Sequence, residues 1–310
     1  MVVLQQMVIF FILMGVGFAA RKTGILAADF LPKLSALIAN VAGPCLIMSG
    51  AIDAGERLTI GQAGFAFAVF IALTAAMVVI GRALPVLLRY PTAQRPAMNF
   101  AFWMTNIGYL GMPFAVSVYG SSAQIYVVLY LIVNNLLLYT YGIWLMQTND
   151  RATAGTSTQS NLRGLLNPGV AAVAITVVLY FGGIELPYVI GAPIKMLGST
   201  TAPLAMMLVG AQLMEQNLGQ MLRDVRLAAF TLLKMLALPI VLLLAVRPFV
   251  ADPNLFAACL AIVAMPSGVL VSAFSLLYDP KNAPVATRTV AFTTFVAVVT
   301  VPLVALAVGL

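Results

Sequence analysis

The sequence contains no histidine, and charged residues make up only 8% of its 310 residues. Histidine is the commonest metal ligand and the usual base of nucleophilic triads, so its absence argues against a His-ligated metal centre and Ser-His or Cys-His catalysis. The two cysteines, Cys45 and Cys259, lie in apolar segments and are interpreted as small packing residues. We therefore expect a protein that is not an enzyme, with no catalytic residues, metal or cofactor.

Charge is scarce because apolar residues dominate, at 62% of the chain and a mean hydropathy of +1.05. This composition predicts an all-α polytopic membrane protein. The apolar runs are continuous rather than alternating, which excludes a porin-type barrel. We expect ten membrane spans, at roughly 2–20, 30–52, 62–84, 97–119, 122–146, 168–184, 192–214, 227–249, 254–278 and 286–308.

The net charge of +7 is distributed as a topology signal. The loops after odd-numbered spans, with their flanks, hold twelve of the basic residues, whereas the opposite side holds only Arg57, Lys195 and Arg247. By the positive-inside rule the first set faces the cytoplasm, so both termini lie outside a cytoplasmic membrane. The charge therefore does not indicate a nucleic-acid partner; the expected surroundings are the lipid bilayer.

The one long polar connection, 148–167, is rich in Ser, Thr and Gly and predicts a cytoplasmic linker. It divides the chain into a first repeat, 1–147, and a second repeat, 168–310, with five spans each. Features recur at matching ranks: Pro44 and Pro203 lie in the second and seventh spans, and broken stretches lie in the fourth and ninth. Because the number of spans per half is odd, the two repeats are expected to be inverted.

The broken stretches are the most informative feature. Proline and glycine weaken a helix, and freed backbone groups are tolerated in a membrane only where they face protein or a wet cavity. We expect the fourth and ninth spans to break at mid-membrane and to cross, so that half-helix N-termini form a site for a carboxylate or another anion. The alternative is that these residues only kink packed helices. The residues assigned to this site are Asn106, Gly108, Gly111, Pro113, Pro266, Ser267 and Gly268.

Other polar residues within spans are candidates for the same site. Asn134, with Asn135 beside it, lies mid-way along the fifth span and either faces the crossing or bonds a neighbouring helix. Thr293 and Thr294 are weaker candidates, since threonine can bond its own helix backbone. Lys234 either snorkels to the interface or faces the pathway, pairing with an anion or with opened backbone carbonyls.

At these residues the sequence resembles the auxin efflux carrier family, which includes plant PIN-FORMED carriers and bacterial organic-acid permeases. Asn106-Ile-Gly-Tyr-Leu-Gly-Met-Pro113 is similar to the family's fourth-span motif Asn-x-Gly-Phe-Leu-Gly-x-Pro, and Ala264-Met-Pro-Ser-Gly268 to its ninth-span Ala-x-Pro. The stretch from Pro203 to Ala211 and the pair Lys234 and Pro239 match further motifs. The resemblance covers nearly the whole chain.

The resemblance implies a fold like that of the bile acid sodium symporters, with spans 1, 2, 6 and 7 as scaffold and spans 3–5 and 8–10 as the moving domain. It also implies elevator motion, a small carboxylate substrate close to Met48 and Ser49, and a homodimer through helices 2 and 7. We expect a secondary transporter of small organic anions that binds its substrate at the crossing. The alternative within transport is a sodium-coupled symporter of bile-acid type. A receptor that binds without flux is a further alternative.

Overall fold

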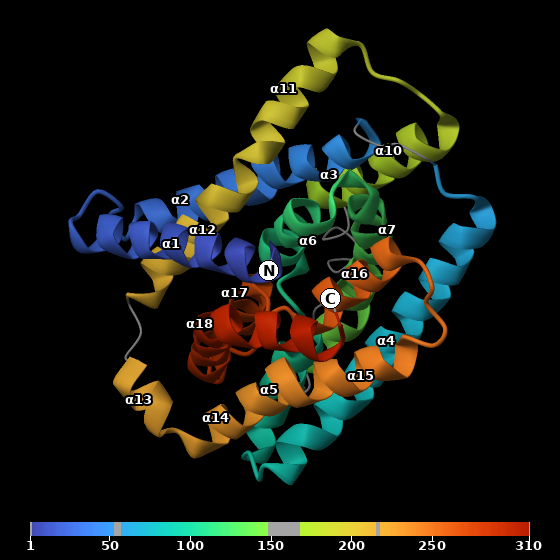
Figure 1. Ribbon diagram of the computed structural model, residues 1–310. Coiled ribbons are helices and arrows are strands. Elements are labelled where there is room, and N and C mark those ends of the chain that lie inside the picture. Colours follow the sequence, from blue (N-terminus) through green and yellow to red (C-terminus); the bar gives the residue numbers. More distant parts are fainter. Residues whose placement is uncertain (1, 53–56, 148–167, 215–217, 310) are drawn as a thin grey trace.

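The computed structural model describes residues 2–52, 57–147, 168–214 and 218–309, and these ranges are almost entirely helical (Figure 1). The predicted linker 148–167 lies outside them. The helices, in chain order, are α1 (Val2–Lys22), α2 (Phe30–Leu37), η1 (Ile38–Ala42), α3 (Gly43–Ile52), α4 (Ile60–Leu87), η2 (Thr92–Gln94), α5 (Arg95–Trp103), η3 (Ile107–Gly111), α6 (Met112–Tyr119), α7 (Ser121–Leu137), η4 (Leu138–Gly142), α8 (Ile143–Met146), α10 (Pro168–Gly182), α11 (Tyr188–Ser199), α12 (Thr201–Leu213), α13 (Leu218–Arg223), α14 (Val225–Leu232), η6 (Leu233–Ala237), α15 (Leu238–Val246), α16 (Pro253–Ala264), α17 (Val269–Tyr278) and α18 (Ala283–Ala307).

Seven helices in the described ranges are long and apolar enough to cross a membrane, so the protein is a multi-pass membrane protein. They correspond to the first, second, third, fifth, seventh, eighth and tenth predicted spans. The other three predicted spans consist of shorter apolar helices. The sixth is α10, and the fourth and ninth are each divided in two. The division of the ninth coincides with Pro266 and Gly268, whereas the fourth divides at residues 104–106, just before Gly108.

Four helical segments of the described ranges contain a wider π-helical turn, and proline explains the position of three of them, η1, η3 and η6. The fourth, η4, has no proline after it. The backbone N–H groups of Gly43, Met112 and Leu238 each donate to the carbonyl five residues earlier, and the next residue is a proline each time. Proline has no N–H group and clashes with the carbonyl four residues before it. Widening the preceding turn relieves that conflict without ending the helix.

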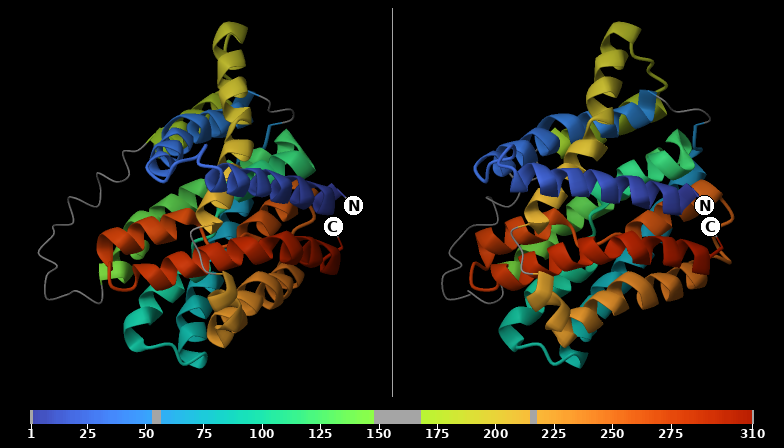
Figure 2. Two further views of the ribbon diagram at one scale, coloured as in Figure 1. Left: turned by 90° about the vertical axis from the view of Figure 1, so that its left-hand side faces the viewer. Right: turned by 60° about the vertical axis from the view of Figure 1, so that its left-hand side comes forward.

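The helices form two groups. The first group contains α1, α2–η1–α3, α10 and α11–α12, in which α1 packs along α12 and α10 packs along α3. The second group contains α4 to α8 and α14 to α18. Figure 2 shows the two groups stacked, with α11 projecting from the first. The two chain ends lie close together in every view (Figures 1 and 2).

The most buried helices lie inside the second group. Residues 97–103 of α5, 123–131 of α7 and 255–264 of α16 are all buried. A helix that is apolar and buried around its whole circumference is surrounded by protein rather than lipid. The interrupted segments that contain α5 and α16 therefore meet in the interior of the molecule.

Candidate functional site

The two interruptions lie side by side. Residues 104–106 separate α5 from η3, and residues 265–268 separate α16 from α17. The backbone N–H of Asn106 donates to the Pro266 carbonyl at 2.7 Å, and the N–H of Gly268 donates to the Met104 carbonyl at 2.8 Å. Together they form an isolated antiparallel bridge between Thr105 and Ser267. The two broken segments thus satisfy each other's freed backbone groups, as buried irregular backbone requires.

The C-terminal end of α5 is capped by side chains from the second half of the chain. Ser267 Oγ donates to the Ala101 carbonyl at 2.6 Å, and Lys234 Nζ donates to the Phe102 carbonyl at 2.7 Å. Lys234 is only 1% exposed and its ammonium also lies 5.6 Å from the centre of the Phe102 ring. Lys234 therefore does not snorkel: its positive charge meets the negative end of the α5 dipole.

The opposite helix ends open onto a cavity. η3, which continues into α6, and α17 both begin at the bridge, so their first turns carry N–H groups that have no acceptor within the helix. A cavity of about 270 Å³ is lined by residues of both first turns, by α2–η1–α3 and by α7. The cavity thus lies between the two helix groups and against two positive dipole ends.

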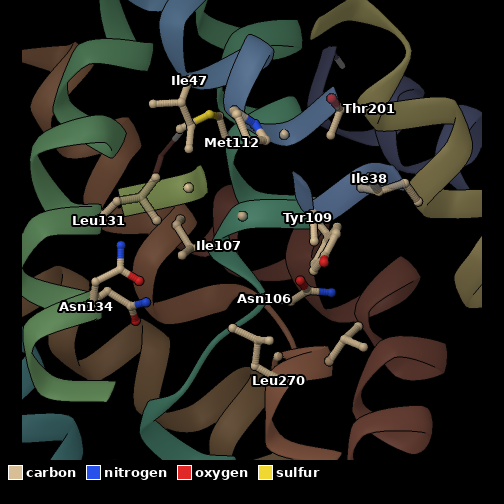
Figure 3. A pocket seen from close by; sticks show the side chains of 18 of the residues that line it. Ile38, Ile47, Asn106, Ile107, Tyr109, Met112, Leu131, Asn134, Thr201 and Leu270 are labelled. Carbon is tan, nitrogen blue, oxygen red and sulfur yellow. The ribbon is translucent and has the colours of Figure 1, made fainter. Parts of the chain in front are cut away.

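Four polar side chains that line this cavity have a buried atom without a hydrogen-bond partner in the described structure. These atoms are Thr105 Oγ1, Asn106 Nδ2, Asn134 Oδ1 and Thr201 Oγ1. Each of the four residues is at most 2% exposed. Buried polar groups are normally paired, so unpaired ones in residues around a cavity are available to a bound molecule. Figure 3 shows Asn106, Asn134 and Thr201 around the same space.

Four of the residues predicted for the site line this cavity: Asn106, Gly108, Asn134 and Gly268. Asn135, the neighbour of Asn134, lines it too. Gly108 has no atom within 4 Å of where a Cβ would lie, whereas a Cβ on Gly268 would lie 3.0 Å from the Thr105 carbonyl oxygen. Gly268 therefore permits the close backbone contact of the bridge, and Gly108 leaves the first turn of η3 open to the cavity.

The structure does not bring the other predicted residues to the cavity wall. Pro266 and Ser267 lie within the bridge, and Lys234 lies behind α5. Gly111 and Pro113 shape the turn between η3 and α6, where a Cβ on Gly111 would lie 2.6 Å from Ile107 Cδ1. Their direct contact with a substrate stays a prediction.

Met48 and Ser49 also lie away from this cavity. The α3 residues that line it are Gly43, Pro44 and Ile47. Ser49 Oγ instead donates to the Leu46 carbonyl at 2.7 Å and accepts from Gln124 Nε2 at 3.1 Å. Ser49 therefore joins α3 to α7 rather than facing the cavity.

The tenth-span threonines act on the backbone. Thr293 Oγ1 accepts from the Ser267 N–H at 3.1 Å and donates to the Thr289 carbonyl at 2.8 Å. Thr294 Oγ1 donates to the Val290 carbonyl at 2.7 Å. Thr293 thus supports the bridge from behind, a role that the sequence did not indicate.

Sequence reasoning missed most of the cavity lining, and three of the missed residues are polar residues without a ring. Thr105 precedes Asn106, and its place in the broken stretch was a usable signal. Thr201 and Asn40 come from the seventh and second predicted spans, where neither is distinguished from other polar residues in a helix. Only the packing of the two helix groups shows that they face the same cavity.

The chemistry of the site is that of binding. Its walls offer amide and hydroxyl groups and two helix N-termini, and no residue that lines the cavity carries a formal charge. In the described parts of the chain, no cluster of three or more His, Cys, Asp or Glu is placed to hold a metal ion. Such a wall can hold a small anion through hydrogen bonds and helix dipoles.

The family comparison agrees with a binding and transport role. Residues 2–305 match the family model described as "Membrane transport protein", which covers almost the whole chain and is a transport family rather than an enzyme family. The comparison with curated proteins finds no match. The motifs around the two interruptions and the match to the family model agree, and the chain belongs to the membrane transport protein family of auxin efflux carriers and PIN-like proteins.

Proposed function

We propose that the protein is a secondary transporter that carries small organic anions with a carboxylate group across the cytoplasmic membrane. The observation that carries the proposal is the cavity at the crossing, where two helix N-termini meet the unpaired polar atoms of Asn106, Thr105 and Thr201. The two N-terminal helix ends place partial positive charge beside the cavity, and Lys234 offsets the negative end of α5 at the same crossing. That arrangement stabilises an anion and disfavours a cation.

The size of the cavity favours a small substrate. Its volume of about 270 Å³ lies just below the range for small-molecule sites, roughly 300–1,000 Å³. Apolar side chains, among them Ile38, Ile47 and Leu131, line much of the remaining wall (Figure 3). We therefore expect a carboxylate whose hydrocarbon or ring portion packs against these residues.

The arrangement of the helices supports an inverted repeat of two five-span halves. In such a repeat the first span corresponds to the sixth and the second to the seventh. The packing of α1 on α12 and of α10 on α3 is related in that way. The fourth and ninth predicted spans, both broken, pair with each other at the bridge. The repeat agrees with a site near mid-membrane at the interface of the halves.

The position of the cavity supports the proposal of an elevator mechanism. Its lining comes from both groups, with Thr201 and Pro44 in the first and Asn106 and Asn134 in the second. Movement of the second group against the first would carry the site across the membrane. The first group would be the scaffold. α11 projects from it with Tyr188 and Val189 at 86% and 80% exposure, which suits lipid or a homodimer through the second and seventh predicted spans, α2–η1–α3 and α11–α12.

Flux measurements test the proposal directly. Purified protein in liposomes is loaded with a series of mono- and dicarboxylates and assayed for exchange or uptake with sodium or potassium as the cation. We expect saturable flux of at least one carboxylate, absent from protein-free liposomes. Strict dependence on sodium would favour the symporter alternative. Binding without flux would identify a receptor and contradict the proposal.

A further inference from the structure

A second polar pocket lies away from the crossing. It has a volume of about 420 Å³ and lies between the connection from α4 to α5 and the start of α14. Tyr90 and Gln94 line one side, and Arg223 and Arg226 line the other. Basic residues in these connections are those that the positive-inside rule assigns to the cytoplasmic face. The pocket is therefore expected at the level of the lipid headgroups.

Tyr90 gives this pocket a buried hydrogen-bond donor. Tyr90 is 6% exposed, and its hydroxyl is buried without a hydrogen-bond partner. Its ring packs edge-on against Phe230, and its carbonyl accepts from Arg95 Nε at 3.0 Å, which fixes the connection in place. Burial, and next the charge of Asp224, raise the pKa of Tyr90. The hydroxyl therefore stays protonated and can donate to an anion.

The charges around Tyr90 favour an anionic ligand. Arg223 and Arg226 are both exposed. The acidic residue in the lining, Asp224, uses its carboxylate as the cap of α14, where Oδ1 accepts from the N–H groups of Arg226 and Leu227, both at 3.1 Å. The two N–H groups at the helix start thus offset part of its negative charge. Two guanidinium groups and a phenol are the donors that a phosphate group binds.

An apolar side chain completes the pocket. Val225, which lies between Arg223 and Arg226 in the sequence, is 78% exposed and lines the same pocket. An exposed valine at the start of a spanning helix is suited to a hydrocarbon chain rather than to water. We propose that this pocket binds the headgroup phosphate of an anionic phospholipid, with Arg223, Arg226 and Tyr90 on the phosphate and Val225 against the acyl chain. The site is independent of the proposed transport activity.

Lipid-dependent stability tests the proposal. The purified full chain is titrated with dioleoyl phosphatidylglycerol in detergent, and thermal unfolding is followed against phosphatidylcholine. We expect phosphatidylglycerol to raise Tm and phosphatidylcholine to have little effect. In the variant Arg223→Gln/Arg226→Gln, the phosphatidylglycerol concentration that gives half of the rise in Tm should increase about tenfold. The reason is that each basic residue near an anionic lipid contributes to the binding affinity. Tyr90→Phe, which keeps the ring, should raise it about fivefold.

Two controls distinguish a specific lipid site from nonspecific electrostatic attraction to an anionic lipid. Lys22→Gln/Lys33→Gln removes the same charge from exposed residues of the same predicted face and should keep the wild-type response. If this control loses the response equally, or if the Arg and Tyr variants keep it, the proposal is overturned. Glycerol 3-phosphate is the third arm. Stabilisation by millimolar glycerol 3-phosphate equal to that by the lipid would show a site for free phosphate esters and overturn the lipid assignment.

Discussion

Asn106 is the residue on which the substrate site depends most directly. Its backbone N–H holds the bridge to Pro266, whereas its side-chain Nδ2 is buried without a partner. Substitution by alanine keeps the backbone hydrogen bond to Pro266 but removes the proposed hydrogen bond from Nδ2 to a substrate. We expect Asn106→Ala to weaken carboxylate binding roughly ten- to hundredfold, as for a lost hydrogen bond to a charged group. Tm should change little. Isothermal titration calorimetry measures the dissociation constant, and thermal unfolding of the same preparation measures Tm.

A second buried asparagine provides the control. Asn99 lies on α5, outside the cavity, and its Nδ2 donates to the Tyr141 hydroxyl at 2.8 Å. Asn99→Ala should therefore lower Tm and leave the dissociation constant within about twofold. If Asn106→Ala lowers Tm as Asn99→Ala does while binding stays intact, Asn106 is a packing residue.

Lys234 acts on the site through α5. Its ammonium group holds the Phe102 carbonyl and offsets the negative end of the α5 dipole beside the crossing. A charge at a helix end contributes up to about 2 kcal/mol when partly buried. We expect Lys234→Met to weaken anion binding by roughly tenfold, although Lys234 does not line the cavity. Titration with the best carboxylate measures this effect.

The comparison for Lys234 is an exposed lysine. Lys33 lies on α2 and is exposed to the surroundings. Lys33→Met should leave the dissociation constant unchanged. An unchanged affinity in Lys234→Met as well would restrict Lys234 to the folding of α5, and Tm would then be its only readout.

At the scale of elements, the sequence predicted the interrupted helices because local chemistry decides them. Pro266 and Gly268 lie within the break at 265–268. The break at 104–106 comes directly before the helical turns that contain Gly108 and Pro113, so the sequence located it only to within a few residues. The π-helical turns before Pro44, Pro113 and Pro239 are also caused by proline. From the sequence alone, however, a proline that widens a helical turn cannot be distinguished from one that ends the helix. Only packing decides between the two, since both relieve the same clash.

The packing of α1 on α12 allows a test of one helix pair. A Cβ on Gly17 would lie 2.0 Å from the Met207 carbonyl oxygen, whereas a Cβ on Gly15, two residues away on α1, would meet nothing within 4 Å. Both changes to alanine raise helix propensity by up to about 1 kcal/mol. Gly15→Ala should therefore keep or raise Tm, and Gly17→Ala should lower it by forcing the backbones apart. Equal effects of the two substitutions would mean that α1 does not pack here on α12.

At the scale of the whole molecule, sequence reasoning found the crossing and only part of the cavity wall. Asn106 and Gly268 were found because they sit in conspicuous broken stretches. Thr201 and Asn40 were not, because their role depends on how the first helix group faces the second. No local sequence pattern indicates how the two helix groups pack against each other. The same limit applies to Ser49, which the family resemblance places near the substrate. Ser49 contacts Gln124, and its contact with a substrate stays a prediction.

The contact of Ser49 with Gln124 provides the test of elevator motion, because it joins α3 of the first group to α7 of the second. Gln124 Nε2 donates to the Leu46 carbonyl at 2.6 Å and to Ser49 Oγ at 3.1 Å, so this contact must break if the groups slide past each other. We expect the pair Ser49→Cys/Gln124→Cys, made with Cys45 and Cys259 replaced by alanine, to lose flux when mercuric ion bridges the thiols and to regain it with dithiothreitol. The two single-cysteine variants should be unaffected by mercuric ion, which controls for modification alone. Full cross-linking with flux at the untreated rate would show that the groups move as one body, and substrate would then cross by a local opening around a fixed site.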